Sequence, residues 1–147
     1  RGYLVLNGNP FKADVVYDEI YRQVKQSIFI VDNYIGLKTL EKLINIQKGV
    51  SVSIFSDNLA KGLRKNTYMD FCKEYPNLDI KMFRSGGIFH DRYIILDYGT
   101  DYEKIFLCGS SSKDAGGRIT SILEDPDRKK YDSMIKELLE RETLMLK

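Results

Sequence analysis

The sequence predicts an α/β fold in which helices flank a central mixed, mostly parallel β-sheet. Short apolar runs typical of buried strands alternate with longer segments whose apolar residues recur at helical spacing. The first half follows a strand–helix–strand–helix order, which is typical of parallel strands joined by crossover helices. In the second half the polar turn Tyr98-Gly99-Thr100-Asp101 separates two apolar runs. This turn predicts an antiparallel hairpin on the same sheet.

The elements of the first half follow from their patterns. Residues 3–6 form a short apolar run before the turn Asn7-Gly8-Asn9-Pro10, and residues 11–26 carry Val16, Ile20 and Val24 at helical spacing. Residues 28–31 are uninterrupted apolar residues, whereas residues 50–55 alternate between apolar and serine positions. We therefore expect strands at 3–6, 27–32, 50–55 and 78–83, and helices at 11–26, from 37 to about 49, and at 65–74.

The second half contributes the hairpin and a last helix. The expected strands are 88–97 and 103–109. Asp125-Pro126 combines a helix-capping residue with a proline suited to the first helical turn. The apolar positions 131, 134, 135, 138 and 139 then form one stripe of a helix.

Length and composition restrict the class of protein. With 147 residues, the chain fits one domain spanning 1–147, and because it begins with Arg1 we expect it to be a fragment of a longer protein. Its net charge of +2 argues against nucleic-acid coating by charge alone. Two cysteines and one histidine cannot form a zinc cage, so we expect no metal and no cofactor. No apolar run approaches the ~20 residues of a membrane span, and we expect a cytoplasmic protein.

The strongest chemical signal is His90-Asp91-Arg92 at the start of a predicted strand. Alternation places His90 and Arg92 on one face, roughly 7 Å apart. An arginine fork can bind two phosphate oxygens while a histidine attacks phosphorus or moves a proton. In the alternative interpretation, His90 ends a strand and Arg92 covers an apolar surface with its stem.

Two neighbouring segments favour the phosphate interpretation. Arg84-Ser85-Gly86-Gly87 precedes the hairpin, and the segment 109–117 after it contains glycines, hydroxyls and Lys113. Antiparallel pairing brings His90 and Ser110 to the same edge of the sheet, where α/β proteins bind ligands. Asp32 and Asn33 also end a strand, and they either line this site or cap the next turn. By itself the segment 109–117 is more typical of a mobile surface loop.

His90-x-Arg92-x4-Asp97 followed by Gly109-Ser110 resembles the phospholipase D superfamily signature, His-x-Lys-x4-Asp followed by Gly-Ser. The chain as a whole is similar to the phospholipase D-like domain of bacterial proteins, some of which also carry a phage-type DNA-binding domain. This resemblance covers the chain up to about residue 117 and implies a phospholipase D-like sandwich fold.

The resemblance also implies a mechanism without a metal. His90 would be the nucleophile that forms a phosphohistidine. Arg92, Ser110, Ser112 and Lys113 would contact the phosphate, and Asp97 would be a supporting carboxylate. Strand parity turns Asp97 away from His90 and Arg92, which favours a structural role for it.

Three departures from the signature matter. Arg92 replaces the usual lysine, Ser112 stands where an asparagine is expected, and the chain has a single histidine. The superfamily uses a second histidine to protonate the leaving group, so an active protein would be a homodimer with two motifs at a twofold axis.

Three functions therefore remain open. The first is a dimeric phosphodiesterase or nuclease acting on nucleic acid, DNA more than RNA. The second is a degenerate module that binds nucleic acid, phospholipid headgroups or a protein partner without turnover. The third is a dimerisation module for a DNA-binding domain outside this fragment.

Overall fold

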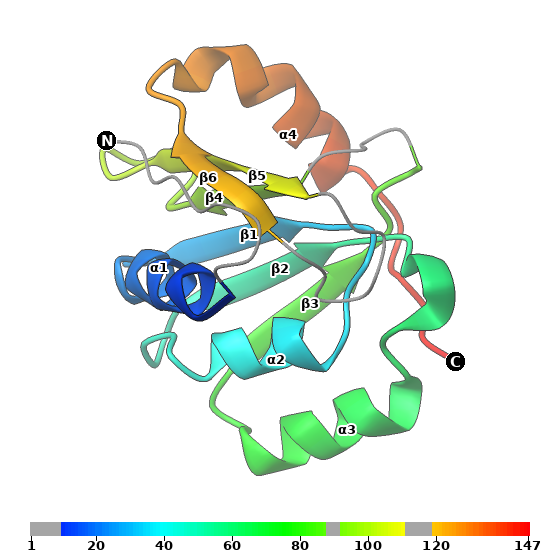
Figure 1. Ribbon diagram of the computed structural model, residues 1–147. Helices are drawn as coiled ribbons and strands as arrows, with labels where there is room; N and C mark the ends of the chain where they lie inside the picture. The colour runs from blue at the N-terminus through cyan, green and yellow to red at the C-terminus, as the bar shows by residue number, and fades with distance from the viewer. Residues whose placement is uncertain (1–9, 88–91, 111–118) are drawn as a thin grey trace.

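The computed structural model describes residues 10–87, 92–110 and 119–147 (Figure 1). The strands are β1 Ser27–Val31, β2 Ser51–Phe55, β3 Asp79–Phe83, β4 Arg92–Leu96, β5 Lys104–Ser110 and β6 Ile119–Glu124. The helices are α1 Pro10–Arg22, α2 Leu37–Leu43, α3 Lys65–Glu74 and α4 Asp132–Leu139, with short 3-10 turns at η1 Leu59–Lys61 and η2 Arg128–Tyr131.

All six described strands form one sheet in the order β3-β2-β1-β4-β5-β6. The expected α/β fold with a mixed sheet between helices is confirmed. The sheet was expected to be mostly parallel, but antiparallel pairs are in the majority among the described strands. The parallel pairs are β1–β2 and β2–β3, and the antiparallel pairs are β1–β4, β4–β5 and β5–β6. Strand β6 was not among the expected strands, because its residues Ile119–Glu124 (ITSILE) neither alternate between apolar and polar nor form a continuous apolar run.

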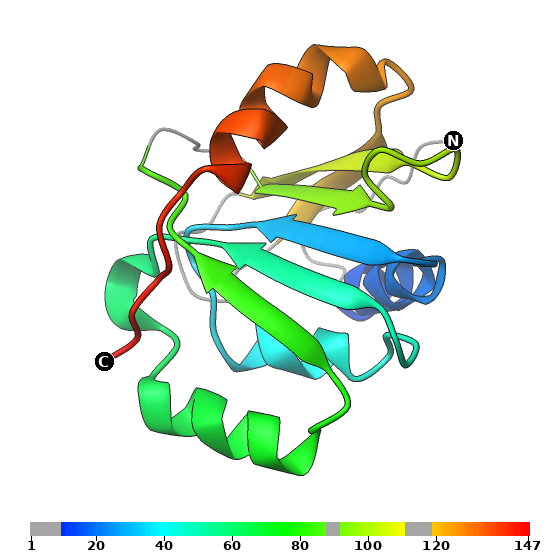
Figure 2. The same cartoon turned by 180° about the vertical axis from the view of Figure 1, so that it is seen from behind.

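Helices cover both faces of the sheet. Figures 1 and 2 show α1, α2 and α3 on one face and α4 on the other. Ile28 and Ile30 pack in the core beneath α1 and α2, whereas Phe29 and Val31 pack in the core beneath α4. This alternation is the physical basis of the layers, because successive side chains of a strand point to opposite faces.

The other strands and helices agree with the patterns, apart from their ends. The expected strand 3–6 lies outside the described residues, as do residues 88–91 of the expected strand 88–97. Helix α1 ends at Arg22 rather than near residue 26, and α2 ends at Leu43 rather than near residue 49. Lys25 and Gln26 leave the helical path because their backbone N–H groups bind the side chain of Asp97. After Leu43 the chain continues in tight turns, with Ile46 N–H bonded to the Leu43 carbonyl.

The C-terminal segment covers the outer edge of β3. Thr143 forms an antiparallel bridge with Phe83, Arg84 donates its N–H to the Glu142 carbonyl at 2.9 Å, and Leu144 donates to the Met82 carbonyl at 3.1 Å. Such cover protects an edge strand from pairing with other chains. None of the described helices is long and apolar enough to cross a membrane.

Candidate active site

One edge of the sheet collects the ends of several strands. The pairings place the carboxyl ends of β1, β2, β3 and β5 at the edge where β4 begins with Arg92. Arg92 lies opposite Cys108 in the β4–β5 pair, so Ser110 lies two residues further along β5 toward this edge, where it pairs with Ile119. The hairpin therefore brings the backbones of Arg92 and Ser110 to the same edge, whereas the predicted juxtaposition of His90 and Ser110 involves a residue outside the described residues.

Arg92 points into the layer beneath α1 and α2, and its side chain is only 9% exposed. Its Nε lies 3.2 Å from Oδ1 of Asp32, at the end of β1. The same Asp32 oxygen accepts the Tyr34 N–H at 2.8 Å. Asp32 thus caps the next turn and also contacts Arg92, so the two alternatives considered for it are compatible.

The buried surroundings of this ion pair shift several pKa values. Burial raises the pKa of Asp32 above its ordinary value, and the opposing influence of Arg92 is smaller. Burial also raises the pKa of the neighbouring Cys108 thiol to about 12. Burial raises the pKa of Tyr17 well above its ordinary value, with Cys108 the next cause. Cys108 is therefore a neutral thiol at physiological pH, and it is not an alternative nucleophile.

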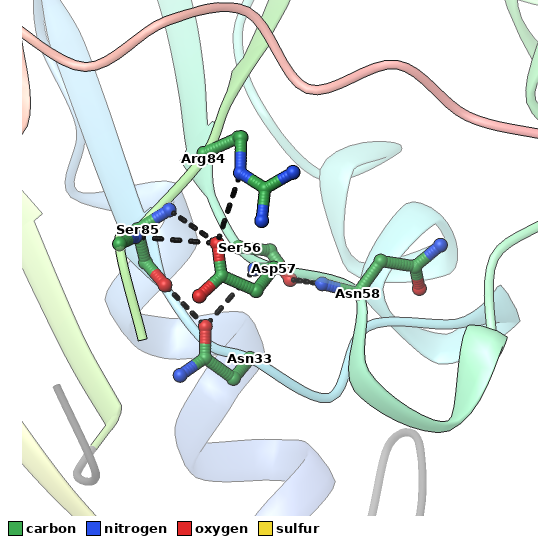
Figure 3. Close-up of polar contacts among 7 residues, drawn as sticks. Asn33, Ser56, Asp57, Asn58, Arg84 and Ser85 are labelled. Carbon is green, nitrogen blue, oxygen red and sulfur yellow. Dashed lines mark hydrogen bonds and ion pairs between the residues drawn. The ribbon is translucent and has the colours of Figure 1, made fainter. Parts of the chain in front are cut away.

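Polar residues from the ends of β1, β2 and β3 form a second network at this edge (Figure 3). Asp57 Oδ1 accepts the N–H groups of Ser85 and Gly86, both at 3.2 Å, and lies 3.7 Å from Nε of Arg84. Asn33 Oδ1 accepts the Ser85 hydroxyl and, at 3.0 Å, the Asp57 N–H. Sequence reasoning singled out Arg84, Ser85 and Asn33 but missed Asp57. The position of Asp57 just after the predicted strand 50–55 could have indicated a role at this edge, because α/β proteins bind ligands at the carboxyl ends of their strands.

Asp97 lies at the opposite end of β4 from Arg92, about 16 Å along the strand. It is 1% exposed. Its carboxylate accepts backbone N–H groups of Lys25, Gln26 and Ser27 at distances from 2.6 to 3.2 Å. Asp97 therefore ties β4 to the segment between α1 and β1.

The remaining predicted site residues, His90, Ser112 and Lys113, lie outside the described residues. His90 is two residues before Arg92 in the chain. Within residues 10–87, 92–110 and 119–147, no group of three or more His, Cys, Asp or Glu side chains is arranged to hold a metal ion.

No family model matches the sequence, and no curated protein is significantly similar to it. Its structure, however, is similar to solved structures. NucT from Helicobacter pylori matches with a TM-score of 0.62 and 16% identity, over 99% of this chain and 99% of that one. TrmBL2, an archaeal chromatin protein whose structure shows a novel mode of DNA binding, matches with a TM-score of 0.59 and 16% identity over 98% of this chain.

A polyphosphate kinase from Porphyromonas gingivalis matches with a TM-score of 0.54 and 15% identity over 95% of this chain. The chain spans 55% of the TrmBL2 chain and 23% of the kinase chain. At these identities the similarities establish the fold, which is the phospholipase D-like α/β fold that the sequence resemblance implied.

Proposed function

We propose that the protein is a metal-independent phosphodiesterase that cleaves nucleic acid as a homodimer, with His90 as its nucleophile. The observation that carries this proposal is the meeting of Arg92 with the ends of β1, β2, β3 and β5 at one sheet edge. A guanidinium at the carboxyl edge of an α/β sheet is well suited to hold a phosphate beside the histidine two residues earlier.

The reaction would proceed in two displacements. An imidazole nitrogen of His90 attacks phosphorus and forms a P–N bond, while the P–O bond to the leaving group breaks. A protonated His90 from the second protomer gives its proton to the leaving oxygen. Water then attacks the phosphohistidine, loses its proton to the second imidazole and releases the phosphomonoester. Arg92 would hold the nonbridging oxygens in both steps.

The comparisons support a polymeric substrate with repeated phosphate groups. The solved structures with this fold include a polyphosphate kinase and a chromatin protein with a novel mode of DNA binding. Near the same edge, Arg84 extends a half-exposed guanidinium, 51% accessible, that can contact a phosphate backbone.

A second candidate, a phosphate-binding module without turnover, is favoured by the Arg92–Asp32 ion pair. Both side chains are mostly buried, at 9% and 14% exposure, so Asp32 competes with any phosphate for the guanidinium. A module that only binds nucleic acid needs the anion site but does not need the imidazole of His90.

The test is cleavage of single- and double-stranded DNA in EDTA by the wild-type chain, by His90→Ala and by Asp101→Ala. Asp101 lies in the β4–β5 turn at the opposite edge and serves as the matched control. We expect chelator-resistant cleavage that His90→Ala abolishes and Asp101→Ala retains, together with a phosphohistidine that is trapped by alkaline quenching. A folded chain that binds DNA but cleaves none would establish the binding module instead. Cleavage that EDTA abolishes would contradict the mechanism.

A further inference from the structure

Four basic residues lie on two neighbouring segments that follow β2 and β3. Lys61, Arg64 and Lys65 lie between β2 and α3, in the stretch that includes η1, and all three are exposed. Arg84 directly follows β3, and its side chain is 51% exposed. Figures 1 and 2 show the stretch with η1 beyond the arrowheads of β2 and β3, at the sheet edge where β4 begins with Arg92. We call these four residues the basic edge.

The C-terminal segment limits the extent of the basic edge. The Glu142 carbonyl accepts the N–H of Arg84 at 2.9 Å, and the Lys147 carbonyl accepts the N–H of Lys65 at 3.0 Å. Because only the segment 142–147 joins the two carbonyls, the backbones of Arg84 and Lys65 are at most about 20 Å apart. One strand of B-form DNA carries a charge every ~3.4 Å along its axis, so this distance accommodates several consecutive phosphates.

The loop that carries Lys61 is held in a strained conformation. Asn58, Ala60 and Lys61 have positive φ values of 49°, 62° and 52°, which residues other than glycine rarely adopt. The Asn58 side chain closes the loop, since its Nδ2 donates to the Leu63 carbonyl at 2.9 Å and its Oδ1 accepts the Leu63 N–H at 3.2 Å. Such strain persists where the surroundings enforce it, and it is common at ligand clamps. A fixed backbone also reduces the entropy that is lost on binding.

Hydrogen bonds fix this loop relative to Arg84. Leu59 donates its N–H to the Asn33 carbonyl at 2.7 Å, and Asn33 Oδ1 accepts the Asp57 N–H at 3.0 Å. Asp57 Oδ1 in turn lies 3.7 Å from Nε of Arg84 (Figure 3). The two segments of the basic edge therefore belong to one hydrogen-bonded unit.

The charges of the basic edge are available to a ligand. In the part of the chain that the structure describes, Lys61, Arg64 and Lys65 form no ion pair. Arg84 contacts Asp57 through Nε and still exposes half of its side chain. Since the whole chain has a net charge of only +2, this group is a local excess of positive charge rather than part of a generally basic surface.

We propose that the basic edge binds the sugar–phosphate backbone of a nucleic-acid strand, independently of base sequence. Exposed lysine and arginine side chains contact phosphate oxygens and release the counterions of the polymer, but they read no bases. A strand held there passes along the ends of β3 and β2 toward Arg92. That guiding role rests on the proposed phosphodiesterase function, whereas the binding itself does not.

Variants that remove or retain charge test this proposal. Lys61→Gln/Arg64→Gln removes two charges and keeps long polar side chains, whereas Lys61→Arg/Arg64→Lys keeps both charges. Lys25→Gln/Lys48→Gln is the matched control, because these exposed lysines precede β1 and β2 at the opposite edge of the sheet. Fluorescence anisotropy gives the Kd of a labelled oligothymidylate over a range of salt concentrations, and calorimetry gives the Kd of a dialkyl phosphate.

We expect Lys61→Gln/Arg64→Gln to raise the Kd for the oligothymidylate about 5- to 20-fold at low salt, because two exposed charge contacts are lost. The slope of log Kd against log salt should fall by ~1.4, which is twice the ~0.7 of one contact with a single strand. The Kd for the dialkyl phosphate should change less than about twofold, because salt screens charges at this distance from Arg92. The charge-retaining variant and the opposite-edge control should behave like wild type.

No binding of the oligothymidylate by the wild-type chain, or equal salt slopes in wild type and Lys61→Gln/Arg64→Gln, would overturn the proposal. An equal loss in the opposite-edge control would overturn it too, since net charge alone would then set the affinity. Loss of polyglutamate binding without loss of oligothymidylate binding would assign the basic edge to an acidic protein instead.

The same measurements separate this proposal from the proposed function. If the wild-type chain cleaves no DNA while the salt slope falls as expected, the phosphodiesterase fails and the backbone-binding surface stands. If cleavage depends on His90 but the salt slopes are equal, the surface fails and the phosphodiesterase stands.

Discussion

Arg92 and Asp32 form an ion pair across the β1–β4 junction, with 3.2 Å between Nε and Oδ1. Their side chains are only 9% and 14% exposed, so water screens the two charges weakly. Burial raises the pKa of Asp32, which means that the buried surroundings destabilise its ionised form relative to the neutral acid. A phosphate that binds Arg92 therefore meets a competing carboxylate whose charge is already costly.

Asp32→Asn should increase the affinity of the site for a phosphodiester anion. The amide retains the shape of the side chain and an oxygen for Arg92, but it removes the negative charge that opposes the ligand. We expect Kd to fall about 3- to 10-fold, which corresponds to ~1 kcal/mol for one weakly screened charge. Titration calorimetry with a dialkyl phosphate measures this change, with Asp79→Asn at the opposite end of β3 as the control.

The same competition predicts a pH dependence. The pKa of Asp32 is raised above its ordinary value of 3.8. Lowering the pH toward this raised pKa therefore neutralises Asp32, while the phosphodiester keeps its charge. Wild-type affinity should therefore rise as the pH falls below neutrality, and Asp32→Asn should remove this rise. Equal slopes in the two proteins, or weaker binding by Asp32→Asn, would show that Asp32 supports phosphate binding instead.

Asp97 should be required for stability rather than for the chemical step. It has a positive φ of 53°, and its carboxylate satisfies three backbone N–H groups. Asp97→Ala leaves those donors buried without an acceptor, so we expect a loss of about 3 kcal/mol or more in the free energy of unfolding. Asp97→Asn should cost less, because asparagine retains an acceptor and tolerates positive φ. Urea unfolding measures both, and full stability with lost cleavage in Asp97→Ala would assign Asp97 to catalysis.

The sequence predicted the described elements that have strong local patterns. The run Ile28–Val31 and the alternation from Val50 to Phe55 lie where expected. The apolar stripe of the last helix lies on η2 and α4, but α4 begins at Asp132 rather than directly after Asp125-Pro126, because a 3-10 turn intervenes. Strand parity favoured a structural role for Asp97, which stays a prediction, and the structure places its carboxylate on backbone N–H groups at the far end of β4 from Arg92. These successes share a cause, since each depends on residues that are neighbours in the sequence or separated by a fixed period.

The features that the sequence did not predict depend on contacts between residues far apart in the chain. The antiparallel β1–β4 pairing, which places Arg92 beside Asp32, joins residues 60 positions apart, and no local pattern encodes it. Asp57 escaped notice for the same reason, because its partners Ser85 and Gly86 follow the next strand. Sequence reasoning located the sheet edge and offered Asp32 for it, but it could not name Asp57 or the partners of either carboxylate.

Asp125 should contribute to stability in a pH-dependent way. Its carboxylate accepts the Tyr131 hydroxyl and contacts Lys130 Nζ, both at 2.6 Å, and hydrogen bonding to Lys130 is the main cause that lowers its pKa from 3.8 to about 2. A lowered pKa stabilises the fold above the unfolded value, and this contribution is lost as the pH falls from about 4 to about 2. Asp125→Asn should therefore unfold at lower urea than wild type at pH 6 and at the same urea near pH 2. A gap that persists at pH 2 would mean that packing, not charge, is what the substitution disturbs.

Removing residues 142–147 should both destabilise the protein and expose a sheet edge. The truncation removes the bridge to Phe83, the Glu142 carbonyl that accepts the Arg84 N–H, and the Leu144 N–H that donates to the Met82 carbonyl. It also removes the buried side chain of Leu144, which is 8% exposed. We expect a loss of about 3 kcal/mol from apolar burial and hydrogen bonds together. The free β3 edge should also cause concentration-dependent association, which light scattering detects.

Leu144→Ala separates the two effects of this truncation. It creates a cavity that should cost about 2–3 kcal/mol, but it leaves the backbone pairing along β3 in place. The substituted protein should therefore be less stable without associating further. If the truncated protein and Leu144→Ala associate equally, lost stability rather than the exposed edge drives the association. If the truncated protein shows no additional association at all, then the charged residues Asp79 and Lys81 on β3 are enough to protect the strand without the C-terminal segment.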